Sequence, residues 1–502
     1  MSPFQGEGRR SESGLPLMNA KQMQEKAKNI PTAFVIFGAT GDLMVKKITP
    51  ALFQLFNKGK LPNMFQIVAF SRRDWDTEQF QNHVRKILSE HKNRQHKAED
   101  VEKFVKYFVY KKGDFEESDS YVRLSEYLGR VDGEWKVCSN KLFYLAVPPK
   151  NYETIFKHLA DSGLTLPCGP DEGWTRVIVE KPFGRDLETA QKLDLLLGSL
   201  FKEEQIYRID HYLGKEMVQN ILSFRFHNDL FEDLWGKNNI EKVEIKLLEE
   251  MGVDNRGDFY DGIGALRDFG QNHALQLLAL LTMDAPHDFT AESVRENRAK
   301  ILKTLVPLTL EQVKTSTFRG QYEGYTTVEG VSPNSTTETY FKIIADLSSG
   351  RWKDVPIILE SGKKTEQRKE IIVTFKHRIP CLCPEGTHYK NKIVFSLEPK
   401  EGIIIDFWSK KPGLDFEMHK QKLSFLFRDQ RKKSQYIEEY EKLLLDCILG
   451  NQLLFVSTEE VKAMWNFIDS IASAWDKEAV PLVKYKPGKK VLVESGGKPA
   501  LK

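Results

Sequence analysis

The first two hundred residues alternate short apolar runs with amphipathic stretches of helical period. A continuous apolar run such as 33–38 is typical of a strand buried on both faces, and a period near 3.6 predicts a helix. The expected strands are 33–38, 66–71, 141–147, 176–180 and 205–209, and the expected helices are 78–91, 151–160, 187–200 and one from about residue 42 that Pro50 ends or kinks. This alternation predicts a parallel sheet with helices on both sides.

Beyond about residue 235 the pattern changes to strict alternation of apolar and polar positions, as in 243–247. Such alternation indicates an antiparallel sheet with one polar face. The other expected strands are 341–347, 357–360, 371–375, 392–397 and 403–407, and helices at 265–283, 292–304, 434–449 and 458–477 are expected to cover the second face. We therefore predict an α/β Rossmann-like N-terminal domain (31–209) and an α+β C-terminal domain (210–490) with a large, mostly antiparallel sheet, between flexible tails at 1–30 and 491–502.

Composition narrows the classes of protein. The chain has 502 residues, is 40% hydrophobic and 29% charged, and carries a net charge of +3, so we expect no nucleic-acid or membrane partner. The first thirty residues are polar and lack the apolar stretch of a secretory signal, which favours a cytoplasmic location. The five cysteines are odd in number and have no scaffold spacing, so we expect reduced thiols. The Cys381-x-Cys383 pair lacks the second pair that a zinc site needs.

A glycine turn follows the first expected strand. Gly38 permits a tight turn, and Gly41 lets the backbone approach a pyrophosphate at the start of the next helix. A simple strand-to-helix turn is the alternative. The second strand ends in Ser71-Arg72-Arg73 rather than in an acid, and an arginine there accommodates a 2′-phosphate, so NADP is the expected cofactor. The alternative is a basic strand end in solvent.

A polar cluster precedes the helical stretch 217–224. Asp210, His211, Tyr212 and Lys215 lie within six residues at the helix entrance, where unpaired N–H groups already favour an anion. We predict a phosphate site made by His211, Tyr212 and Lys215, and Asp210 is suited to orienting an imidazole. A capped surface helix with solvated charges is the alternative.

Two further motifs supply candidate acid–base groups. Glu180-Lys181-Pro182 ends a buried strand at the ligand-binding side of the sheet, where Lys181 can contact both cofactor and substrate. His273 is the candidate base, with Gly270 one turn earlier leaving open space for a sugar; a satisfied core histidine is the alternative. On an ideal helix Asp268 lies roughly 140° away from His273. We therefore expect Asp210 to orient the ring and Asp268 to accept a substrate hydroxyl.

These motifs, in this order, resemble those of glucose-6-phosphate dehydrogenases from about residue 33 to about residue 475. The resemblance implies oxidation of D-glucose 6-phosphate to 6-phospho-D-glucono-1,5-lactone with NADP, the first step of the pentose phosphate pathway. It also implies that His273 is the general base and Asp210 its orienting partner, with no metal. The implied substrate contacts are Lys181, His211, Tyr212, Lys215, Glu249, Asp268, Lys363 and Arg368. The implied cofactor contacts are Gly38, Ala39, Thr40, Gly41, Asp42, Leu43, Arg72, Tyr152 and Lys181.

The sequence departs from the family pattern at several positions. Met44 stands where the family commonly has alanine, and Glu398 where it often has glutamine near the sugar. Ile404 and Asp406 replace the Tyr and Lys with which some members hold a second, structural NADP, so we predict that this site is absent.

The family resemblance also implies a homodimer or homotetramer formed through the C-terminal sheet. NAD is a weaker alternative cofactor. Two alternative functions remain at this point: another Glu-Lys-Pro-type NAD(P)-dependent sugar dehydrogenase, and a non-catalytic NADP-binding protein.

Overall fold

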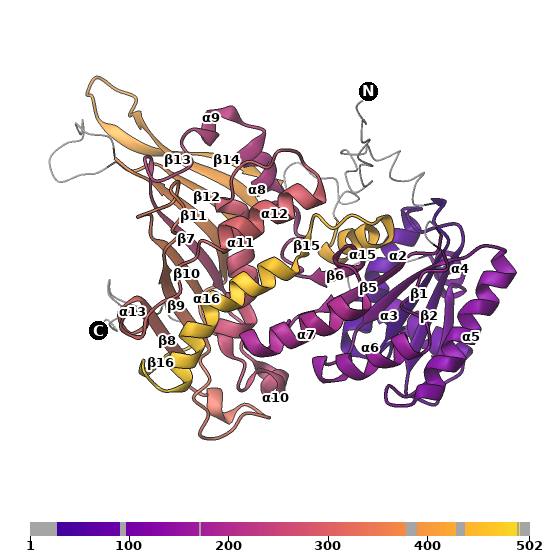
Figure 1. Ribbon diagram of the computed structural model, residues 1–502. Coiled ribbons are helices and arrows are strands. Elements are labelled where there is room, and N and C mark those ends of the chain that lie inside the picture. Colours follow the sequence, from indigo (N-terminus) through magenta and orange to yellow (C-terminus); the bar gives the residue numbers. More distant parts are fainter. Residues whose placement is uncertain are drawn as a thin grey trace, which may run out of the picture.

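The computed structural model describes residues 28–90, 97–169, 172–377, 389–427, 437–488 and 491, and shows two sheets side by side (Figure 1). Cys381 and Cys383 lie outside the described residues. Within the described part no helix has the length and apolar character needed to cross a bilayer.

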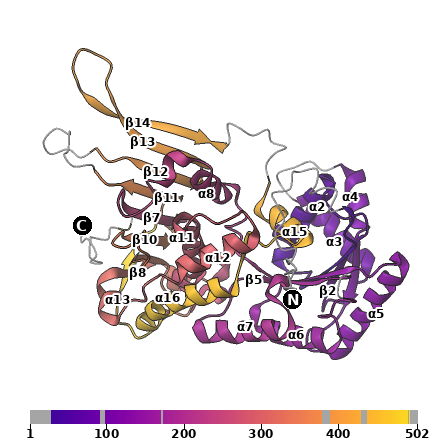
Figure 2. The same ribbon diagram turned by 45° about the horizontal axis from the view of Figure 1, so that its top comes forward.

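The first sheet has seven strands in the order β15-β6-β5-β4-β1-β2-β3. All pairs are parallel except β15 with β6. Helices α2, α3, α4 and α15 contact one another on one side, and α5, α6 and α7 on the other (Figure 2). The strands are β1 (Thr32–Phe37), β2 (Phe65–Ser71), β3 (Phe108–Lys112), β4 (Asn140–Leu145), β5 (Thr175–Glu180), β6 (Ile206–Ile209) and β15 (Phe455–Val456). The helices are α2 (Thr49–Asn57), α3 (Thr77–Glu90), α4 (Ala98–Val105), α5 (Ser118–Trp135), α6 (Tyr152–Asp161), α7 (Leu187–Leu200) and α15 (Glu439–Leu449).

The second sheet has nine strands in the order β14-β13-β12-β11-β7-β10-β9-β8-β16. It is antiparallel except where β10 pairs with β7 and β16 with β8. The strands are β7 (Ile240–Leu248), β8 (Thr317–Tyr322), β9 (Tyr340–Ala345), β10 (Ile357–Gly362), β11 (Arg368–Phe375), β12 (Lys392–Glu398), β13 (Gly402–Lys410), β14 (Met418–Leu426) and β16 (Leu482–Tyr485). The predicted fold class, a parallel α/β sheet followed by a large, mostly antiparallel sheet, is confirmed.

Helices of the C-terminal half lie between the large sheet and the first domain (Figures 1 and 2). They are α8 (Glu216–Phe226), α11 (Leu275–Thr282), α12 (Ala291–Leu302) and α16 (Thr458–Asp476); the shorter α9 (Asp229–Glu232), α10 (Gly257–Tyr260) and α13 (Leu310–Ser316) lie at the periphery. Residues of both halves join one buried apolar core. Both walls of a cleft between the two sheets are therefore fixed in place by the shared apolar core.

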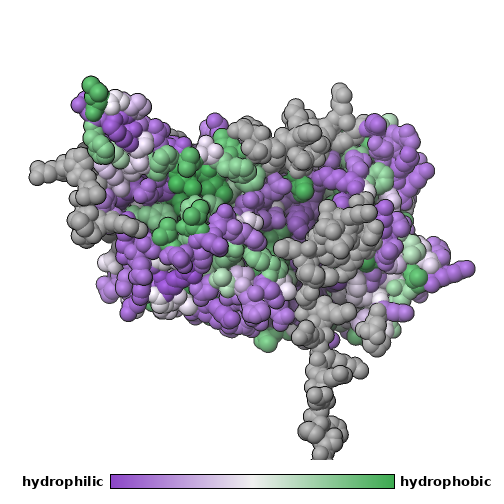
Figure 3. All heavy atoms as spheres, turned by 90° about the horizontal axis from the view of Figure 1, so that it is seen from above, coloured by the Kyte–Doolittle hydropathy of each residue, from purple (hydrophilic) through white to green (hydrophobic). Residues whose placement is uncertain are grey.

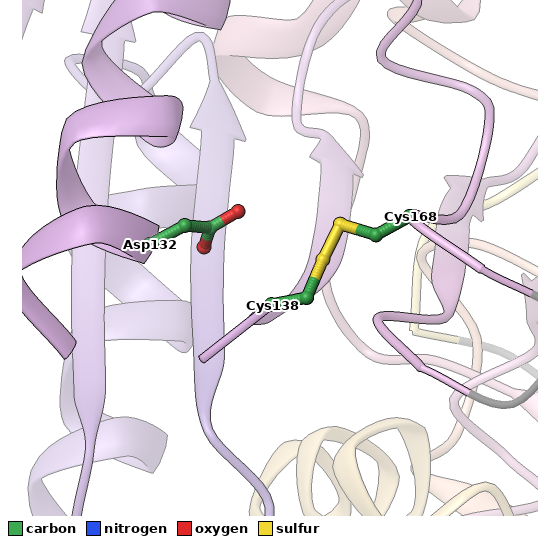
Figure 4. A group of neighbouring side chains, drawn as sticks. All are labelled: Asp132, Cys138 and Cys168. Carbon is green, nitrogen blue, oxygen red and sulfur yellow. A yellow bond between two sulfur atoms is a disulfide. The ribbon is translucent and has the colours of Figure 1, made fainter. Parts of the chain in front are cut away.

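The cysteine expectation was wrong in one respect. Cys138, just before β4, forms a disulfide with Cys168, in the loop that leads to β5 (Figure 4). Their Cα atoms are 6.4 Å apart, within the range that disulfides span. The neighbouring Asp132 is held by Lys141, 2.5 Å away, and accepts a hydrogen bond from the Ser139 N–H. The bridge ties the start of β4 to the loop before β5, while Cys447 is buried and free.

Candidate active site

A cleft of about 660 Å³ opens where the two domains meet. Its first wall comes from the carboxyl ends of the central parallel strands, at Leu145–Pro149 and Glu180–Pro182. The second wall comes from the C-terminal domain, at residues 256–273 and at Glu249, Lys363 and Lys369. Open α/β sheets bind ligands at this end of their strands, where the strand order reverses. The cleft is therefore the candidate site.

The glycine turn lies at the floor of this cleft. Gly38 has a φ of +77°, and a Cβ there would approach Ala146 O to 2.5 Å, so both backbone conformation and space require glycine. Gly41, Asp42 and Leu43 line the cleft. Ala39 and Thr40 lie in the same turn, and Thr40 Oγ1 is 2.9 Å from Ser71 Oγ at the end of β2. The turn suits the pyrophosphate of a dinucleotide, because the glycines let the pyrophosphate approach the peptide backbone closely.

Two predicted cofactor residues differ in how they are placed. Arg72 extends beyond the end of β2, with its guanidinium 5.9 Å from the centre of the Phe115 ring. Tyr152 is buried, donates a hydrogen bond to Glu180 O at 3.1 Å and is not among the residues that line the cleft. Tyr152 thus supports the cleft wall from behind, and the structure offers no surface of this residue to a cofactor.

His273 and Asp210 meet in the cleft, as expected. His273 Nδ1 lies 2.5 Å from Asp210 Oδ1, and both side chains are buried. The same oxygen accepts the Tyr212 N–H at 3.0 Å, so the turn after β6 fixes the carboxylate in place. Burial lowers the pKa of His273 well below its ordinary value, and the charge of Lys181 lowers it further. Burial raises the pKa of Asp210.

Lys181 joins the base to the second acid. Its Nζ lies 2.9 Å from His273 Nε2, 3.1 Å from Asp268 Oδ1 and 3.0 Å from Asp268 O. Because the ammonium group can only donate, it fixes Nε2 as the acceptor and Nδ1 as the protonated nitrogen. Burial works to raise the pKa of Asp268, but the charges of Lys181 and Lys363 lower it to about 2. Asp268 is therefore an anion throughout the neutral range.

The helix that carries these residues is not the α-helix that the sequence predicted. Leu266–Ala274 is a π-helix, and only Leu275–Thr282 is α-helical. In a π-helix each hydrogen bond joins residues five apart, so each turn holds more residues than an α-helical turn, and such turns occur often at functional sites. Asp268 and His273, five apart, consequently lie on the same side and share Lys181. The predicted angular separation was wrong, although Asp210 remains the carboxylate that contacts the ring.

The open space predicted beside Gly270 is absent. A Cβ at this glycine would meet Leu266 Cδ1 at 3.0 Å and the Phe341 ring at 3.2 Å. Gly270 therefore faces the core under the π-helix and not the cleft. Its lack of a side chain allows the helix to pack closely on the large sheet.

The two rings before α8 surround His273. The Tyr212 ring stacks on His273 with centroids 4.1 Å apart, and His211 approaches it edge-on at 4.7 Å. Both line the cleft. Burial lowers the pKa of His211 well below its ordinary value, and the charge of Lys181 acts in the same direction.

The cluster of Asp210, His211 and His273 has the residue types of a metal site. Their donor atoms lie within 4.8 Å of one another. However, both His273 nitrogens are already engaged and the Lys181 ammonium group is adjacent. This arrangement fits proton transfer better than cation binding.

Charged residues at the ends of β7, β10, β11 and β12 and directly before α8 form the far end of the site. Glu249 lies 2.6 Å from Lys363 and 3.0 Å from Lys369. Burial works to raise the Glu249 pKa, but these two lysines hold it below its ordinary value. Lys215, directly before α8, lies 3.1 Å from Glu398. Acids and lysines thus alternate around the space where a phosphorylated polyol would have both its hydroxyls and its phosphate bound.

Some contacts differ from the sequence expectation. Arg368 is held by Glu370 at 2.7 Å and does not line the cleft, whereas the next residue, Lys369, does. Successive residues of a strand point to opposite faces of the sheet. Of Arg368 and Lys369, only Lys369 therefore faces the cleft. The sequence analysis did not identify Lys369, although the alternation of side chains along a strand is a signal that could have pointed to it. Arg256, in a 3-10 turn, and Arg267, in the π-helix, also line the cleft, and the sequence around them gave no such signal.

The two positions linked to a second nucleotide lie on β13. Asp406 is buried and paired with Lys420 of β14 at 2.6 Å, and Ile404 is paired in register with Ser424. A buried anion and an apolar side chain still argue against a phosphate ligand here.

Family models match both halves of the chain. Residues 35–220 match "Glucose-6-phosphate dehydrogenase, NAD binding domain", and residues 222–494 match "Glucose-6-phosphate dehydrogenase, C-terminal domain". The chain belongs to the glucose-6-phosphate dehydrogenase family. The match of residues 35–220 indicates that the N-terminal domain binds a nicotinamide cofactor.

Individual relatives agree with this membership. Glucose-6-phosphate 1-dehydrogenase 2 of Mycobacterium tuberculosis is 37% identical over 466 residues, covering 90% of each chain. The enzyme of Chlamydia muridarum is 38% identical over 468 residues, covering 89% of this chain and 91% of the relative. A solved structure described as glucose-6-phosphate dehydrogenase in complex with its substrate glucose-6-phosphate superposes with a TM-score of 0.85 at 33% identity, covering 92% of this chain and 95% of that one.

Proposed function

We propose that this chain oxidises D-glucose 6-phosphate to 6-phospho-D-glucono-1,5-lactone while NADP is reduced to NADPH, the first step of the pentose phosphate pathway. The observation that carries the proposal is the 2.5 Å contact between His273 Nδ1 and Asp210 Oδ1 inside the cleft. It provides a buried base with its orienting anion, as removal of a hydroxyl proton requires. Relatives of this name and a related structure solved with glucose 6-phosphate support the choice of substrate.

His273 acts as the general base in this proposal. Burial keeps it neutral, and Asp210 holds Nδ1–H, so the Nε2 lone pair faces the cleft. The C1 hydroxyl of the sugar takes the place of the Lys181 ammonium group on His273 Nε2. His273 removes the hydroxyl proton, and Asp210 stabilises the imidazolium that forms. When bound, the nicotinamide supplies the hydride acceptor.

The glycine turn from Gly38 to Leu43 fits the cofactor, since a Cβ at Gly38 would fill the space beside Ala146 O. Arg72 is placed beyond β2 to meet a 2′-phosphate, which supports NADP over NAD. Measuring kcat/KM with each dinucleotide tests this preference. An Arg72→Ala variant should lose most of its activity with NADP and retain its activity with NAD; an equal loss with both would contradict the assignment.

His211, Tyr212 and Lys215 bind the phosphate in this proposal, and Glu249, Asp268 and Lys363 bind the sugar hydroxyls, with Lys181 between sugar and cofactor. All of these residues except Lys215 line one cleft, and Lys215 Nζ lies 5.3 Å from the centre of the Tyr212 ring. These positions support the assignment, because positioning provides much of the rate acceleration in such reactions.

One absorbance assay separates the alternatives. The purified chain is mixed with NADP and either glucose 6-phosphate or unphosphorylated glucose, and NADPH formation is followed. We expect rapid formation with the phosphorylated sugar only. Comparable rates with both sugars would favour a general Glu-Lys-Pro-type sugar dehydrogenase. Binding of NADP without any turnover would favour a non-catalytic nucleotide-binding protein.

We also propose a homo-oligomer formed through the C-terminal sheet. β14 is the edge strand of the nine-stranded sheet, and Leu414, Phe416, Leu423 and Phe425 of the β13–β14 hairpin are exposed. Figure 3 shows apolar surface on the side of the molecule where this hairpin lies. Exposed apolar surface beside an open edge favours association.

A cytoplasmic location is proposed as well, since two Arabidopsis thaliana relatives carry the word "cytoplasmic" in their names. Fractionation of cells would test this location.

A further inference from the structure

Glu398, the last residue of β12, bridges two lysines at the proposed phosphate end of the cleft. Its Oε1 lies 3.1 Å from Lys215 Nζ, and its Oε2 lies 3.0 Å from Lys369 Nζ. Gln367 Nε2 donates a third hydrogen bond to Oε2 at 3.0 Å. Both carboxylate oxygens are therefore used, and both bind groups from other parts of the chain.

The two lysines are poorly solvated. Only 16% of the Lys215 side chain and 9% of the Lys369 side chain are exposed. The nearby acids, together with Tyr212, raise the Lys369 pKa in spite of its burial, so this lysine stays protonated. Two largely buried ammonium groups that converge on one point form an anion site. Glu398 is the anion that occupies this site in the chain itself.

We infer that Glu398 is an internal competitor for the phosphate of the substrate and sets the affinity of the site. The inference rests on the proposed function, in which Lys215 binds that phosphate. A phosphate that approaches Lys215 and Lys369 must displace the carboxylate and then lie beside it. Both steps lower the affinity for a dianion, because the carboxylate neutralises the lysines and repels like charge.

Glu398 acts on binding and not on the chemical step. It is not among the residues that line the cleft, whereas its partner Lys369 is. His273 contacts Asp210 and Lys181, and Lys181 contacts Asp268. None of these contacts involves Glu398. A neutral side chain at position 398 should therefore change KM for the sugar phosphate and leave kcat in place.

The test compares Glu398→Gln with Glu241→Gln. Glu241 of β7 is a matched control: it belongs to the same sheet, pairs with Lys390 at 2.6 Å, is 35% exposed against 28% for Glu398, and lies outside the cleft. The measurements are kcat and KM for glucose 6-phosphate, KM for NADP, and the inhibition constant of inorganic phosphate, which probes the anion site without a sugar.

We expect Glu398→Gln to lower KM for glucose 6-phosphate about fivefold, the size of effect that a partly exposed charge pair can have. The inhibition constant of inorganic phosphate should fall by a similar factor, while kcat, KM for NADP and the Glu241→Gln control stay unchanged. An unchanged or higher KM for the sugar phosphate, or an unchanged inhibition constant of phosphate, would overturn the inference. If circular dichroism shows that Glu398→Gln is unfolded, Glu398→Ser, which also removes the charge, replaces it under the same criteria.

A third variant separates this inference from the proposed function. Lys215→Ala should raise KM for glucose 6-phosphate strongly, because it removes a phosphate ligand. If wild-type enzyme does not turn over this sugar, or if Lys215→Ala leaves KM unchanged, the assignment of the phosphate site fails. A normal Lys215→Ala effect with an unchanged Glu398→Gln variant contradicts only the role of Glu398.

Discussion

His273 has both ring nitrogens in defined contacts, Nδ1 with Asp210 and Nε2 with Lys181. The two contacts have different consequences. The carboxylate fixes the tautomer and favours the protonated ring, whereas the ammonium group disfavours it. Lowering of the His273 pKa by burial and Lys181 keeps the ring available as a proton acceptor at neutral pH.

Replacing the base should abolish turnover and preserve binding. We expect His273→Asn to lower kcat about 10³-fold, within the usual contribution of general base catalysis. The measurement is steady-state kcat, with dissociation constants for NADP and glucose 6-phosphate determined by calorimetry as the control. A variant that kept near-normal kcat would remove His273 from the mechanism.

Lys181 should control the pH at which the base becomes protonated. Its positive charge lowers the pKa of His273, so Lys181→Met should let that pKa rise toward its ordinary value. The acid limb of the kcat/KM profile, where activity falls as His273 takes up a proton, should then move to higher pH. Lys157→Met, a surface change on α6, is the control. A limb that moved to lower pH or stayed in place would contradict this electrostatic role.

At the scale of single residues, the sequence identified the side chains that carry distinctive chemistry. The contact between His273 and Asp210 was predicted because a base needs an orienting anion and the turn after β6 supplies one. Lys369 was missed because a lysine at the start of a strand looks like any solvated cation. Its burial depends on β7 and β12, which are distant in sequence.

The π-helix Leu266–Ala274 is the element on which the site depends most. Glu338 holds its beginning: Oε1 accepts the Leu266 N–H at 2.9 Å, and the Glu338 carbonyl accepts the Ala265 N–H at 3.0 Å. A Cβ at Gly264 would overlap the Glu338 carboxylate, so glycine is needed beside it. The wider turn then brings Asp268 and His273 to one side.

Glu338 should make stability depend on pH. Burial raises its pKa from 4.5 to about 7, so the folded chain binds this proton more tightly than the unfolded chain does. The contribution of Glu338 to stability is therefore full at low pH and is lost as pH rises through its folded pKa. We expect the free energy of unfolding of Glu338→Gln, relative to wild type, to increase by up to about 3 kcal/mol between about pH 5 and about pH 8.

Denaturant unfolding at several pH values measures this difference. Glu311→Gln, a change at an exposed glutamate of α13, should show no such trend. Parallel curves for wild type and Glu338→Gln would mean that Glu338 is ionised in the folded chain over the whole range.

At the scale of elements, the apolar pattern identified most central strands of both sheets and several of the helices. It missed strands β3, β8, β14, β15 and β16 and helices α4, α13 and the long α5, and it treated the whole stretch 265–283 as one α-helix. Apolar spacing cannot separate the two helix types over nine residues. What selects the π-helix is a cap from Glu338, seventy-two positions away from Leu266.

At the scale of the whole molecule, the candidate site lies between a parallel sheet and a mostly antiparallel sheet. Parallel strand ends supply the glycine turn and Lys181, and the C-terminal half supplies the base and the acids. The family resemblance made this arrangement predictable. It did not indicate that β15 and α15 return to the first domain, where β15 pairs with β6 and α15 packs on α2.

Assembly should depend on the edge strand β14. We expect Leu423→Glu to shift the oligomer toward a smaller species, because it places a charge in the exposed apolar surface of the hairpin. Light scattering after size exclusion measures the mass. Leu195→Glu on α7, where the leucine is 73% exposed against 60% for Leu423, is the matched control and should leave the mass unchanged. Equal masses for all three proteins would exclude this strand from the interface.

The return of β15 to the edge of the parallel sheet also bears on how the chain is made. During translation β6 leaves the ribosome long before its partner Phe455–Val456 exists, so that edge stays unpaired until Phe455–Val456 has been made. A transcript truncated before α15 would yield a first domain lacking both its last strand and a covering helix. The two halves are therefore expected to fold as one unit, and neither is expected to be stable as a separate domain.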